Sequence, residues 1–542
     1  MRGLMMDRPL LISSLIRYAA QYRGSAEIVS RSPEDGLHRY TYRDLETRSK
    51  RLGKALERLG VRIGDRIATL AWNGYRHVEL YYGVSGIGAV CHTINPRLFQ
   101  DQIRYIVNHA ADRVLFLDPG FVPLAEELAP HFPKVEHYVV MTESAKMPRT
   151  KLENALCYED LLAAESADYE WPEFDENTAS SLCYTSGTTG RPKGVLYSHR
   201  STVLHAMAES MRDTLDYSMH DVICLIAPMF HANGWACPYA AALVGAKLVL
   251  PGQQLDGASL HELFEAEQVT FSLAVPTVWL GMLDYLRKSG KRFTSLKRTA
   301  IGGTAVPLAM MKAFDEYGVN VIHAWGMTET SPLGTVCSLP PGVAALPADE
   351  RDKYRVKQGH GIWGVDLKLA GPDGSDLPRD GKSSGELLVR GPWVAAGYFN
   401  DEEATAAALA DGWFRTGDVS TLDEDGFMTI VDRSKDVIKS GGEWISSIDL
   451  ENAVMAHPDV QEAAVIGVRH AKWDERPLLI VVAKEGRRPD KQQLLGLLAQ
   501  KFAKWQLPDD VLVVAELPHT ATGKVNKLAL RDRYGDHLLR TA

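Results

Sequence analysis

A stretch of eleven residues rich in hydroxyls and glycines has the composition of an anion-binding loop. It runs from Tyr184 to Gly194 and reads Tyr-Thr-Ser-Gly-Thr-Thr-Gly-Arg-Pro-Lys-Gly. Glycines let backbone N–H groups approach an anion closely, hydroxyls add donors, and Arg191 and Lys193 add positive charge. The stretch lacks the Gly-Lys-Ser/Thr of a Walker A loop, and composition alone also fits a flexible surface loop. We predict that a polyphosphate is held by Thr185, Ser186, Gly187, Thr188, Thr189 and Lys193.

Four further short stretches combine glycine or threonine with a charged or aromatic residue. Two follow strand-like runs: Gly302-Gly303-Thr304-Ala305, and Gly326-Met327-Thr328-Glu329-Thr330 after His323-Ala324-Trp325. The other two are Thr416-Gly417-Asp418 and Thr522-Gly523-Lys524. Taken singly, each is typical of a turn, and an isolated Asp418 or Lys524 is typical of a solvated charge. Their chemistry therefore depends on elements that bring them together.

Strands and helices alternate through the first part of the chain. Thr41 and Asp44 fit a capping box, after which leucines recur on one helical face. Alternation of this kind predicts a parallel sheet covered by helices. A polar passage over about 145–177 is expected to have little regular structure. The runs that we expect to form buried strands are 66–70, 89–91, 113–117, 248–250, 270–273 and 319–322.

The pattern changes near residue 355, where turn signals such as Pro372-Asp373-Gly374 predict a β-rich module. The charged pentapeptide 432–436 then separates this module from a compact tail with both strands and helices. We place the domain boundary there, with a large domain over 1–431 and a small one over 437–542. A chain of 542 residues is too long for one ordinary core, which agrees with this division.

Composition limits the classes of function. The chain has 60 basic and 69 acidic residues, a net charge of −9, which argues against a general nucleic-acid binder. Its six cysteines include no C-x-x-C pair, so we expect a reducing compartment and neither a disulfide framework nor a zinc site. No run approaches the roughly 18 apolar residues of a membrane span, and the first 24 residues predict a short surface helix. We expect a cytoplasmic protein.

Taken in order, these motifs resemble those of the adenylate-forming superfamily, which includes acyl-CoA synthetases, luciferases and peptide-synthetase adenylation domains. The resemblance covers nearly the whole chain, and the combination of 184–194, 326–330 and Gly523-Lys524 is highly specific. It implies an α/β fold: a large N-terminal domain of helix-covered mixed sheets with a β-rich module, and a small, mobile α+β C-terminal domain. It also implies ATP, Mg²⁺ and coenzyme A. A carboxylate would attack the α-phosphorus of ATP, and the thiol of coenzyme A would then displace AMP.

The resemblance implies a role for each matching residue. The loop 185–193 would hold the β- and γ-phosphates, and Glu329 with Thr185 would hold Mg²⁺. Asp418, assisted by Arg433, would accept hydrogen bonds from the ribose hydroxyls. Lys524 would bridge the substrate carboxylate and the α-phosphate, which suits a long, mobile point charge. The adenine would lie between two segments that include Gly302, Gly303, Thr304, His323, Ala324, Trp325, Gly326 and Thr328.

A hinge is implied within the pentapeptide, at Lys435. Rotation of the small domain would withdraw Lys524 and present another segment to the coenzyme A channel. Glycines in that segment permit close backbone approach. A carboxylic acid, ATP and coenzyme A are the implied partners, with a second copy of the chain as a candidate partner in a homodimer. The segment presented to coenzyme A includes Lys439, Ser440, Gly441 and Gly442.

The acid is the least constrained part of the prediction. The run 229–235 matches the acyl-pocket motif, with His231 where acid and thiol would meet and Ala232 and Trp235 beside the substrate. It lacks the Asp with which amino-acid-activating relatives pair the ammonium, which favours an uncharged tail. Trp444 resembles the tunnel gate of fatty-acyl-CoA synthetases, and other segments resemble 3-(methylthio)propionyl-CoA ligases. Because a buried CH₂ contributes only about 0.8 kcal/mol, both tail lengths stay open.

Several alternatives are compatible with parts of the pattern. A luciferase-like enzyme, or another adenylate-forming enzyme with a different acceptor, would share the motifs. A non-catalytic nucleotide or acyl sensor should have lost Lys524, Glu329 or Asp418, and all three are present. The run 359–364 matches G-x-G-x-x-G, but a strand-like run follows it, so we do not predict a dinucleotide fold. The H-x-x-x-D match at 470–474 is short and is better explained by a surface loop.

Overall fold

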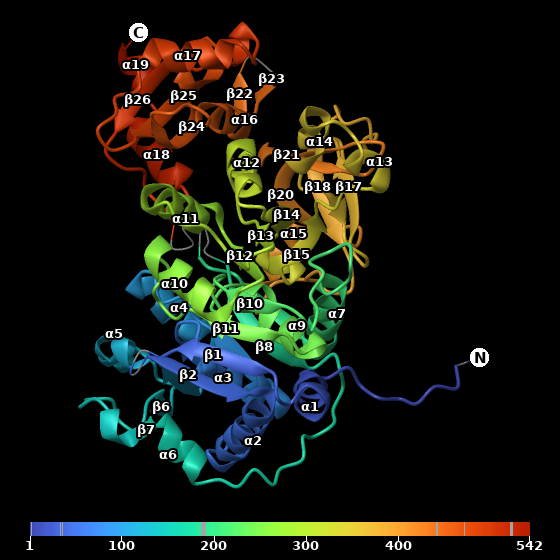
Figure 1. Cartoon of the computed structure of the whole chain (residues 1–542), viewed down its shortest axis with the longest axis vertical. Coiled ribbons are helices and arrows are strands. Elements are labelled where there is room, and N and C mark those ends of the chain that lie inside the picture. The colour runs from blue at the N-terminus through green and yellow to red at the C-terminus, as the bar shows by residue number, and fades with distance from the viewer. Residues whose placement is uncertain are drawn as a thin grey trace.

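Four β-sheets and the helices packed on them make up the chain (Figure 1). The computed structural model describes residues 1, 3–32, 34, 36–185, 191–440, 443–470, 472–520 and 524–541, without the side chains of 443, 444, 540 and 541. Three sheets belong to a large N-terminal part, and the fourth forms a smaller C-terminal part at one end of the molecule (Figure 1). The predicted α/β fold with a large and a small part is therefore confirmed.

The first sheet has seven strands in the order β7-β6-β5-β3-β4-β8-β9. All neighbours are parallel except β8 and β9, which are antiparallel. The passage 145–177 is less irregular than predicted, because it supplies β7 and the helix α6 (Tyr158–Ala163), which buries Tyr158 and Leu162. The strands are β3 (Arg66–Leu70), β4 (Val90–Thr93), β5 (Val114–Leu117), β6 (His137–Val140), β7 (Ala155–Cys157), β8 (Ala179–Tyr184) and β9 (Gly194–Ser198).

The second sheet has nine strands in the order β16-β15-β14-β13-β12-β10-β11-β1-β2. Its six central strands, from β14 to β1, are parallel, and the outer strands are antiparallel. The segments that leave the carboxyl ends of parallel strands share one edge of a sheet, where α/β proteins bind ligands. The strands are β1 (Glu27–Arg31), β2 (Leu37–Thr41), β10 (Val222–Leu225), β11 (Lys247–Leu250), β12 (Phe271–Ala274), β13 (Arg298–Ile301), β14 (Asn320–Gly326), β15 (Leu333–Val336) and β16 (His360–Gly361).

The predicted β-rich module is a five-stranded antiparallel sheet. The G-x-G-x-x-G segment 359–364 contains β16, precedes the first strand of this module and opens no helix, as expected. Its strands are β17 (Asp366–Ala370), β18 (Gly385–Arg390), β19 (Leu409–Ala410), β20 (Trp413–Leu422) and β21 (Met428–Arg433).

The C-terminal part is a five-stranded sheet with helices, and the chain enters it between Arg433 and Ile438. The first two residues of the charged pentapeptide thus still belong to β21. The exact domain limits remain a prediction. Its elements are β22 (Ile438–Ser440), β23 (Glu443–Ile445), β24 (Val460–His470), β25 (Asp474–Ala483), β26 (Asp510–Val514), α16 (Ser447–Val454), α17 (Lys491–Ala499), α18 (Lys527–Tyr534) and α19 (His537–Thr541).

Helices cover the N-terminal sheets. One of them, α2, begins with the predicted capping box of Thr41 and Asp44. The first helix, α1, is less exposed than predicted, because it packs against α2 and α9 and buries Ile12 and Ile16. The α-helices are α1 (Ile12–Tyr22), α2 (Tyr42–Arg58), α3 (Tyr75–Gly86), α4 (Gln100–Ala110), α5 (Val122–Leu128), α7 (His199–Glu209), α8 (Ala232–Trp235), α9 (Cys237–Val244), α10 (Gly257–Glu267), α11 (Pro276–Ser289), α12 (Leu308–Glu316), α13 (Pro341–Ala344), α14 (Ala348–Arg355) and α15 (Glu402–Ala408).

Short 3₁₀ turns complete the secondary structure. They are η1 (Pro119–Phe121), η2 (Ala129–His131), η3 (Ser144–Lys146), η4 (Thr328–Thr330) and η5 (Lys504–Gln506). Within the described ranges, no helix combines the length and the apolar character that crossing a bilayer requires.

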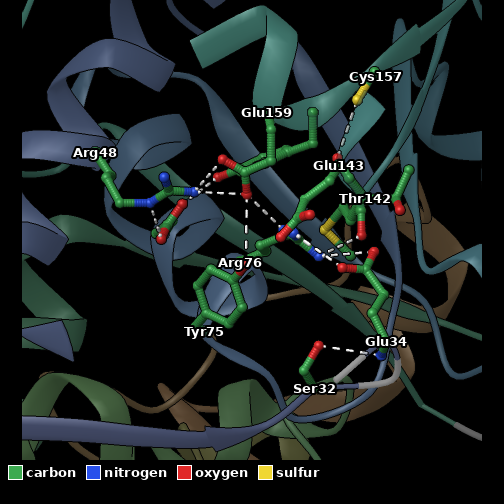
Figure 2. A network of polar contacts seen from close by, with 12 residues as sticks. Ser32, Glu34, Arg48, Tyr75, Arg76, Thr142, Glu143, Cys157 and Glu159 are labelled. Atoms are coloured by element: carbon green, nitrogen blue, oxygen red, sulfur yellow. Dashed lines mark hydrogen bonds and ion pairs between the residues drawn. The ribbon is translucent and has the colours of Figure 1, made fainter. Parts of the chain in front are cut away.

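Helix α3 lies between the seven-stranded and the nine-stranded sheet and carries part of a largely buried ion network (Figure 2). All residues of α3 are buried, and the helix contacts β1, β4 and β8. Arg76 at its start pairs with Glu159 (Nε–Oε1 2.8 Å) and Glu34 (Nη1–Oε1 3.3 Å), and Arg48 of α2 pairs with Glu79 (Nε–Oε1 2.7 Å). Because its charges are paired, a helix with ionised residues can be buried on every side.

Candidate functional site

The predicted phosphate loop joins β8 to the antiparallel strand β9, with Tyr184 opposite Gly194. Its neck is closed by two hydrogen bonds: the Thr185 N–H donates to the Lys193 carbonyl (2.9 Å), and the Lys193 N–H donates to the Thr185 hydroxyl (3.3 Å). The predicted loop residues Ser186, Gly187, Thr188 and Thr189 lie outside the described residues.

Glu329 lies in η4, close to Lys193 at the neck of the phosphate loop. The Tyr398 hydroxyl donates to Glu329 Oε1 (2.6 Å), and the Lys193 ammonium lies 4.9 Å from the centroid of the same tyrosine ring. Burial raises the pKa of the Glu329 carboxyl, whereas Tyr398, Arg433 and Lys193 favour its ionised form. A carboxylate, a hydroxyl and an ammonium therefore meet at the base of the phosphate loop.

The two predicted nucleotide segments leave neighbouring parallel strands, since Ile301 of β13 pairs with His323 of β14. Backbone packing at the ends of these two strands leaves no room for a side chain at positions 302 and 326. A Cβ on Gly302 would lie 2.8 Å from the Ala324 carbonyl oxygen, and a Cβ on Gly326 would lie 1.9 Å from a carbonyl oxygen of Pro332. The structure thus brings together the segments that were expected to enclose adenine.

The polar residues of these segments have different surroundings. The His323 ring is buried beside Gln358 (Nε2–Nε2 3.4 Å), and burial lowers its pKa to about 4. Thr304 is exposed, whereas the Thr328 carbonyl is buried and accepts a hydrogen bond from a tyrosine of β9. Trp325 donates its indole N–H to Asp418 (2.9 Å), a link between β14 and β20 that the sequence did not predict.

Asp418 and Arg433 face each other across β20 and β21 as register partners. Arg433 Nε lies 2.7 Å from Asp418 Oδ1, and the carboxylate is 2% exposed. Because Trp325 and Arg433 bind different oxygens, the carboxylate has a fixed orientation.

Lys524 comes from the C-terminal part but lies in the electrostatic field of this site. Removal from water, together with the charges of Arg433 and Lys435, lowers its pKa to about 8, and Asp418 and Glu329 oppose that shift. The loop that carries Lys524 is closed by hydrogen bonds with Thr520, between the Lys524 carbonyl and the Thr520 N–H (2.7 Å) and between the Lys524 N–H and the Thr520 hydroxyl (3.2 Å).

His231 belongs to the same site, since burial and the charge of Lys524 lower its pKa to about 4. The five residues after it, Ala232–Ala236, have φ values between 42° and 63°, so the short element α8 is a left-handed turn and not a regular α-helix. A left-handed conformation costs an L-residue about 1–2 kcal/mol, so this turn needs support from its surroundings. A Cβ on Gly302 would lie 3.7 Å from the Trp235 ring, which puts that ring beside the nucleotide segments.

Comparison with known proteins identifies the family of this chain. The family model described as AMP-binding enzyme matches residues 16–399, and the model of the AMP-binding enzyme C-terminal domain matches 449–524. The chain belongs to the AMP-binding enzyme family.

Relatives of this AMP-binding enzyme match along its whole length. A 3-methylmercaptopropionyl-CoA ligase of Ruegeria lacuscaerulensis is 52% identical over 99% of this chain and 100% of its own. A medium-chain-fatty-acid–CoA ligase of Ectopseudomonas oleovorans is 50% identical, with coverages of 100% and 99%. A long-chain-fatty-acid–CoA ligase of Thermus thermophilus is 47% identical, with coverages of 98% and 97%.

Solved structures agree with the fold of this AMP-binding enzyme. The anthranilate CoA ligase AuaEII in complex with anthranoyl-AMP has a TM-score of 0.86 at 26% identity, with coverage of 97% of this chain and 98% of that one. A Mycobacterium tuberculosis fatty acyl CoA synthetase has a TM-score of 0.73 at 26% identity, with coverages of 97% and 99%.

The segment 439–442 was predicted to face coenzyme A. Its described residues, Lys439 and Ser440, bind to strand β25 of the C-terminal sheet of this AMP-binding enzyme. The Lys439 N–H donates to Glu475 (2.9 Å), and the buried Ser440 hydroxyl accepts a hydrogen bond from Arg476 (3.1 Å). Gly441, Gly442 and the Trp444 side chain lie outside the described part of the chain.

Two residues of the site were missed from the sequence. Tyr398 binds Glu329 but belongs to no spaced motif. Asn73, buried before α3, donates to the carbonyls of Leu225 (2.8 Å) and Ala227 (2.9 Å) and accepts from the Met229 N–H (2.8 Å). It thereby fixes the segment that leads to His231, a role without a local sequence signal because its partners lie more than 150 residues away.

Proposed function

We propose that this AMP-binding enzyme is an AMP-forming acyl-CoA ligase, which converts an aliphatic carboxylic acid into a coenzyme A thioester through an acyl-adenylate. One observation carries the proposal: Lys524, from the far part of the chain, lies where the charges of Asp418 and Glu329 act on its ammonium group. A protein that only binds AMP has no need of this additional cation. The relatives named CoA ligases, at 47% to 52% identity, support coenzyme A as the acceptor.

Charge compensation is the main task of such a site, because a carboxylate and a triphosphate repel each other. Lys193, Arg433 and Lys524 are among the described residues that supply positive charge. Preorganised cations and donors stabilise charge that is redistributed in the transition state, and positioning removes much of the entropic barrier. The triphosphate would lie against the loop 185–193, whose neck is formed by Thr185 and Lys193.

Mg²⁺ fits the donors at the base of this loop. This ion binds oxygen ligands and is commonly held by one or two carboxylates together with substrate phosphates. Glu329 offers a carboxylate that is 5% exposed, and Thr185 offers a hydroxyl. These two residues would hold the ion, which when bound neutralises charge on the departing pyrophosphate.

The nucleoside would lie between the segments 302–304 and 323–328, with Asp418 toward the ribose hydroxyls. Trp325 and Arg433 would keep that carboxylate oriented. Lys524 would donate to the acid and to the α-phosphate while the carboxylate oxygen bonds to the α-phosphorus and the bond to pyrophosphate breaks. Its withdrawal from water strengthens this interaction.

In the second step the thiol of coenzyme A attacks the acyl carbon and AMP leaves, a step for which Lys524 has no proposed task. We propose that the C-terminal part rotates about Lys435 and presents the segment 439–442 instead. The chain crosses between the two parts only once within the described residues, in the segment between β21 and β22, which supports a hinge there.

The acid would have an uncharged aliphatic tail. Ala232 and Trp235 would contact it near His231, and Trp444 would gate the tunnel. The printed names of the relatives cover methylmercaptopropionate, medium-chain and long-chain acids, all with such tails. Since apolar pockets discriminate chain length gradually, we propose a broad preference.

Release of pyrophosphate across a series of acids tests the proposal. Acids from propionate to palmitate, with 3-(methylthio)propionate, should release pyrophosphate only with ATP and Mg²⁺, and acyl-CoA should appear only when coenzyme A is added. Release without any acid would indicate a different ATPase. Light, or an oxidised product that requires oxygen, would indicate a luciferase-like enzyme.

The cytoplasmic location and the homodimer remain predictions. Fractionation of cells that express the protein tests the first. Light scattering of the purified protein tests the second, because a monomer at micromolar concentration would contradict it.

A further inference from the structure

The turn that separates His231 from the nucleotide segments has an unusual backbone. Five successive residues are left-handed, and four of them, Ala232, Asn233, Trp235 and Ala236, are not glycine. The left-handed region is sterically unfavourable for residues with a Cβ, and Asn is among the few that visit it. Such a conformation persists only where the surroundings determine it.

Asn233 supplies that support through its side-chain amide. Its Nδ2 donates to the Ser181 hydroxyl (2.7 Å), and its Oδ1 accepts from the Cys183 thiol (3.3 Å). Ser181 and Cys183 are two residues apart in β8, so their side chains point to the same face of the strand. All three residues are at most 3% exposed, which means that water does not compete for these bonds.

The contact of Asn233 with β8 joins two regions of the site, the phosphate loop and the turn that follows His231. Strand β8 continues directly into Thr185, the first residue of the phosphate loop. The turn lies between His231, close to Lys524, and Trp235, close to Gly302. The segment before His231 has its own support in Asn73, and the Asn233 amide ties the turn to the strand of the phosphate loop.

We propose that Asn233 is a positioning residue of the ligase reaction, which holds the acid-side turn 231–236 in register with the phosphate loop. It touches neither substrate nor metal in this role. The inference rests on the proposed function, since the two reactants that it aligns are a carboxylate and a triphosphate. Loss of the contact should impair alignment and leave ATP binding in place, because the residues proposed to bind ATP are unchanged.

Asn233→Gly isolates the contact. Glycine accepts the left-handed backbone, so the substitution removes the amide and adds no backbone strain. In acid-dependent pyrophosphate release we expect kcat to fall roughly tenfold to a hundredfold, as for a misplaced reactant, with KM for ATP within about twofold of wild type. Ser181→Ala removes the partner from the other side and should give the same pattern in a smaller degree. Because Ser181→Ala removes one of the two hydrogen bonds that Asn233→Gly already removes, their effects in the double variant should not multiply.

Asn154→Gly is the matched control. Asn154 is also left-handed (φ 55°), but it is exposed and its side chain binds the Glu136 carbonyl (3.3 Å) far from the site. The Asn154→Gly variant should retain the kcat and KM of the wild-type protein.

Three results would overturn the inference: an unchanged kcat in Asn233→Gly, a loss confined to melting temperature, or losses in the single variants that multiply in the double variant. Wild-type protein without acid-dependent pyrophosphate release would instead contradict the proposed function, so the two failures are distinguishable.

Discussion

Lys524 illustrates how a single residue is tuned by its surroundings. Water exclusion and two neighbouring cations lower its pKa to about 8, although Asp418 and Glu329 oppose the shift. The side chain is therefore cationic at neutral pH and loses its charge within an accessible pH range. A group that must neutralise two anions cannot do so once it is deprotonated.

We predict that kcat/KM for pyrophosphate release declines as pH rises above about 8, because this parameter reports ionisations of the free enzyme. The sign follows from the lowered pKa, since the required cation is present below that pH and lost above it. Lys524→Arg stays charged throughout and should remove the decline, at a lower absolute rate. A Lys524→Arg variant with the same decline would assign the ionisation to another group.

Tyr398 gives a second prediction for a single residue. Its hydroxyl stabilises the ionised form of a buried carboxyl, so Tyr398→Phe should raise the pKa of Glu329 further and weaken binding of Mg²⁺. We expect the Mg²⁺ concentration for half-maximal rate to rise roughly tenfold or more, about the effect of one charge-assisted hydrogen bond. Tyr285→Phe, which removes a hydroxyl bound to the exposed Lys291, is the control. An unchanged Mg²⁺ dependence would separate Tyr398 from the metal site.

Among the elements, α3 depends on the network shown in Figure 2. Arg76→Leu would leave Glu34 and Glu159 without their shared partner in a site where the arginine is 5% exposed. Removal of one member of a buried ion pair costs about 3–5 kcal/mol, so the melting temperature should fall by several degrees. Lys288→Ala breaks an exposed pair with Asp284 and should have little effect. Equal melting temperatures for both variants would contradict a stabilising role of the network.

The sequence predicts elements better than it predicts their neighbours. Apolar runs located β3, β4, β5, β11, β12 and β14, because burial and periodicity are local properties. The short strand β7 and helix α6 were missed, since a few apolar side chains such as Tyr158 and Leu162 suffice to dock a polar segment. The left-handed turn at 232–236 could not be predicted, because its support comes from β8, about fifty residues earlier. The roles of the site residues remain predictions that rest on resemblance and geometry.

At the scale of the whole molecule, Asp432 joins the two parts. It lies at the end of β21, 1% exposed, and accepts from the Ser447 N–H at the start of α16 (2.7 Å). This contact belongs to the arrangement in which Lys524 lies in the site. Asp432→Ala would leave a buried N–H unsatisfied, at a cost of about 1–3 kcal/mol to that arrangement.

We predict that Asp432→Ala slows acyl-adenylate formation severalfold and leaves thioester formation from preformed acyl-adenylate intact. Lys524→Ala should show the same selectivity more strongly. Asp510→Ala, which breaks contacts with Lys491 and His537 inside the C-terminal part, should spare both half-reactions. Equal losses in both half-reactions of Asp432→Ala would show that the contact supports the fold and not one arrangement.

The late position of Lys524 has a consequence for biosynthesis. A ribosome delivers every other proposed contact to the nucleotide before it delivers this lysine, so a nascent chain can fold its larger part while it is still tethered. Such an intermediate could capture nucleotide but could not consume it. Translation itself would therefore delay the chemistry until residue 524 has been added, and a chain that stalls before that point would not consume ATP.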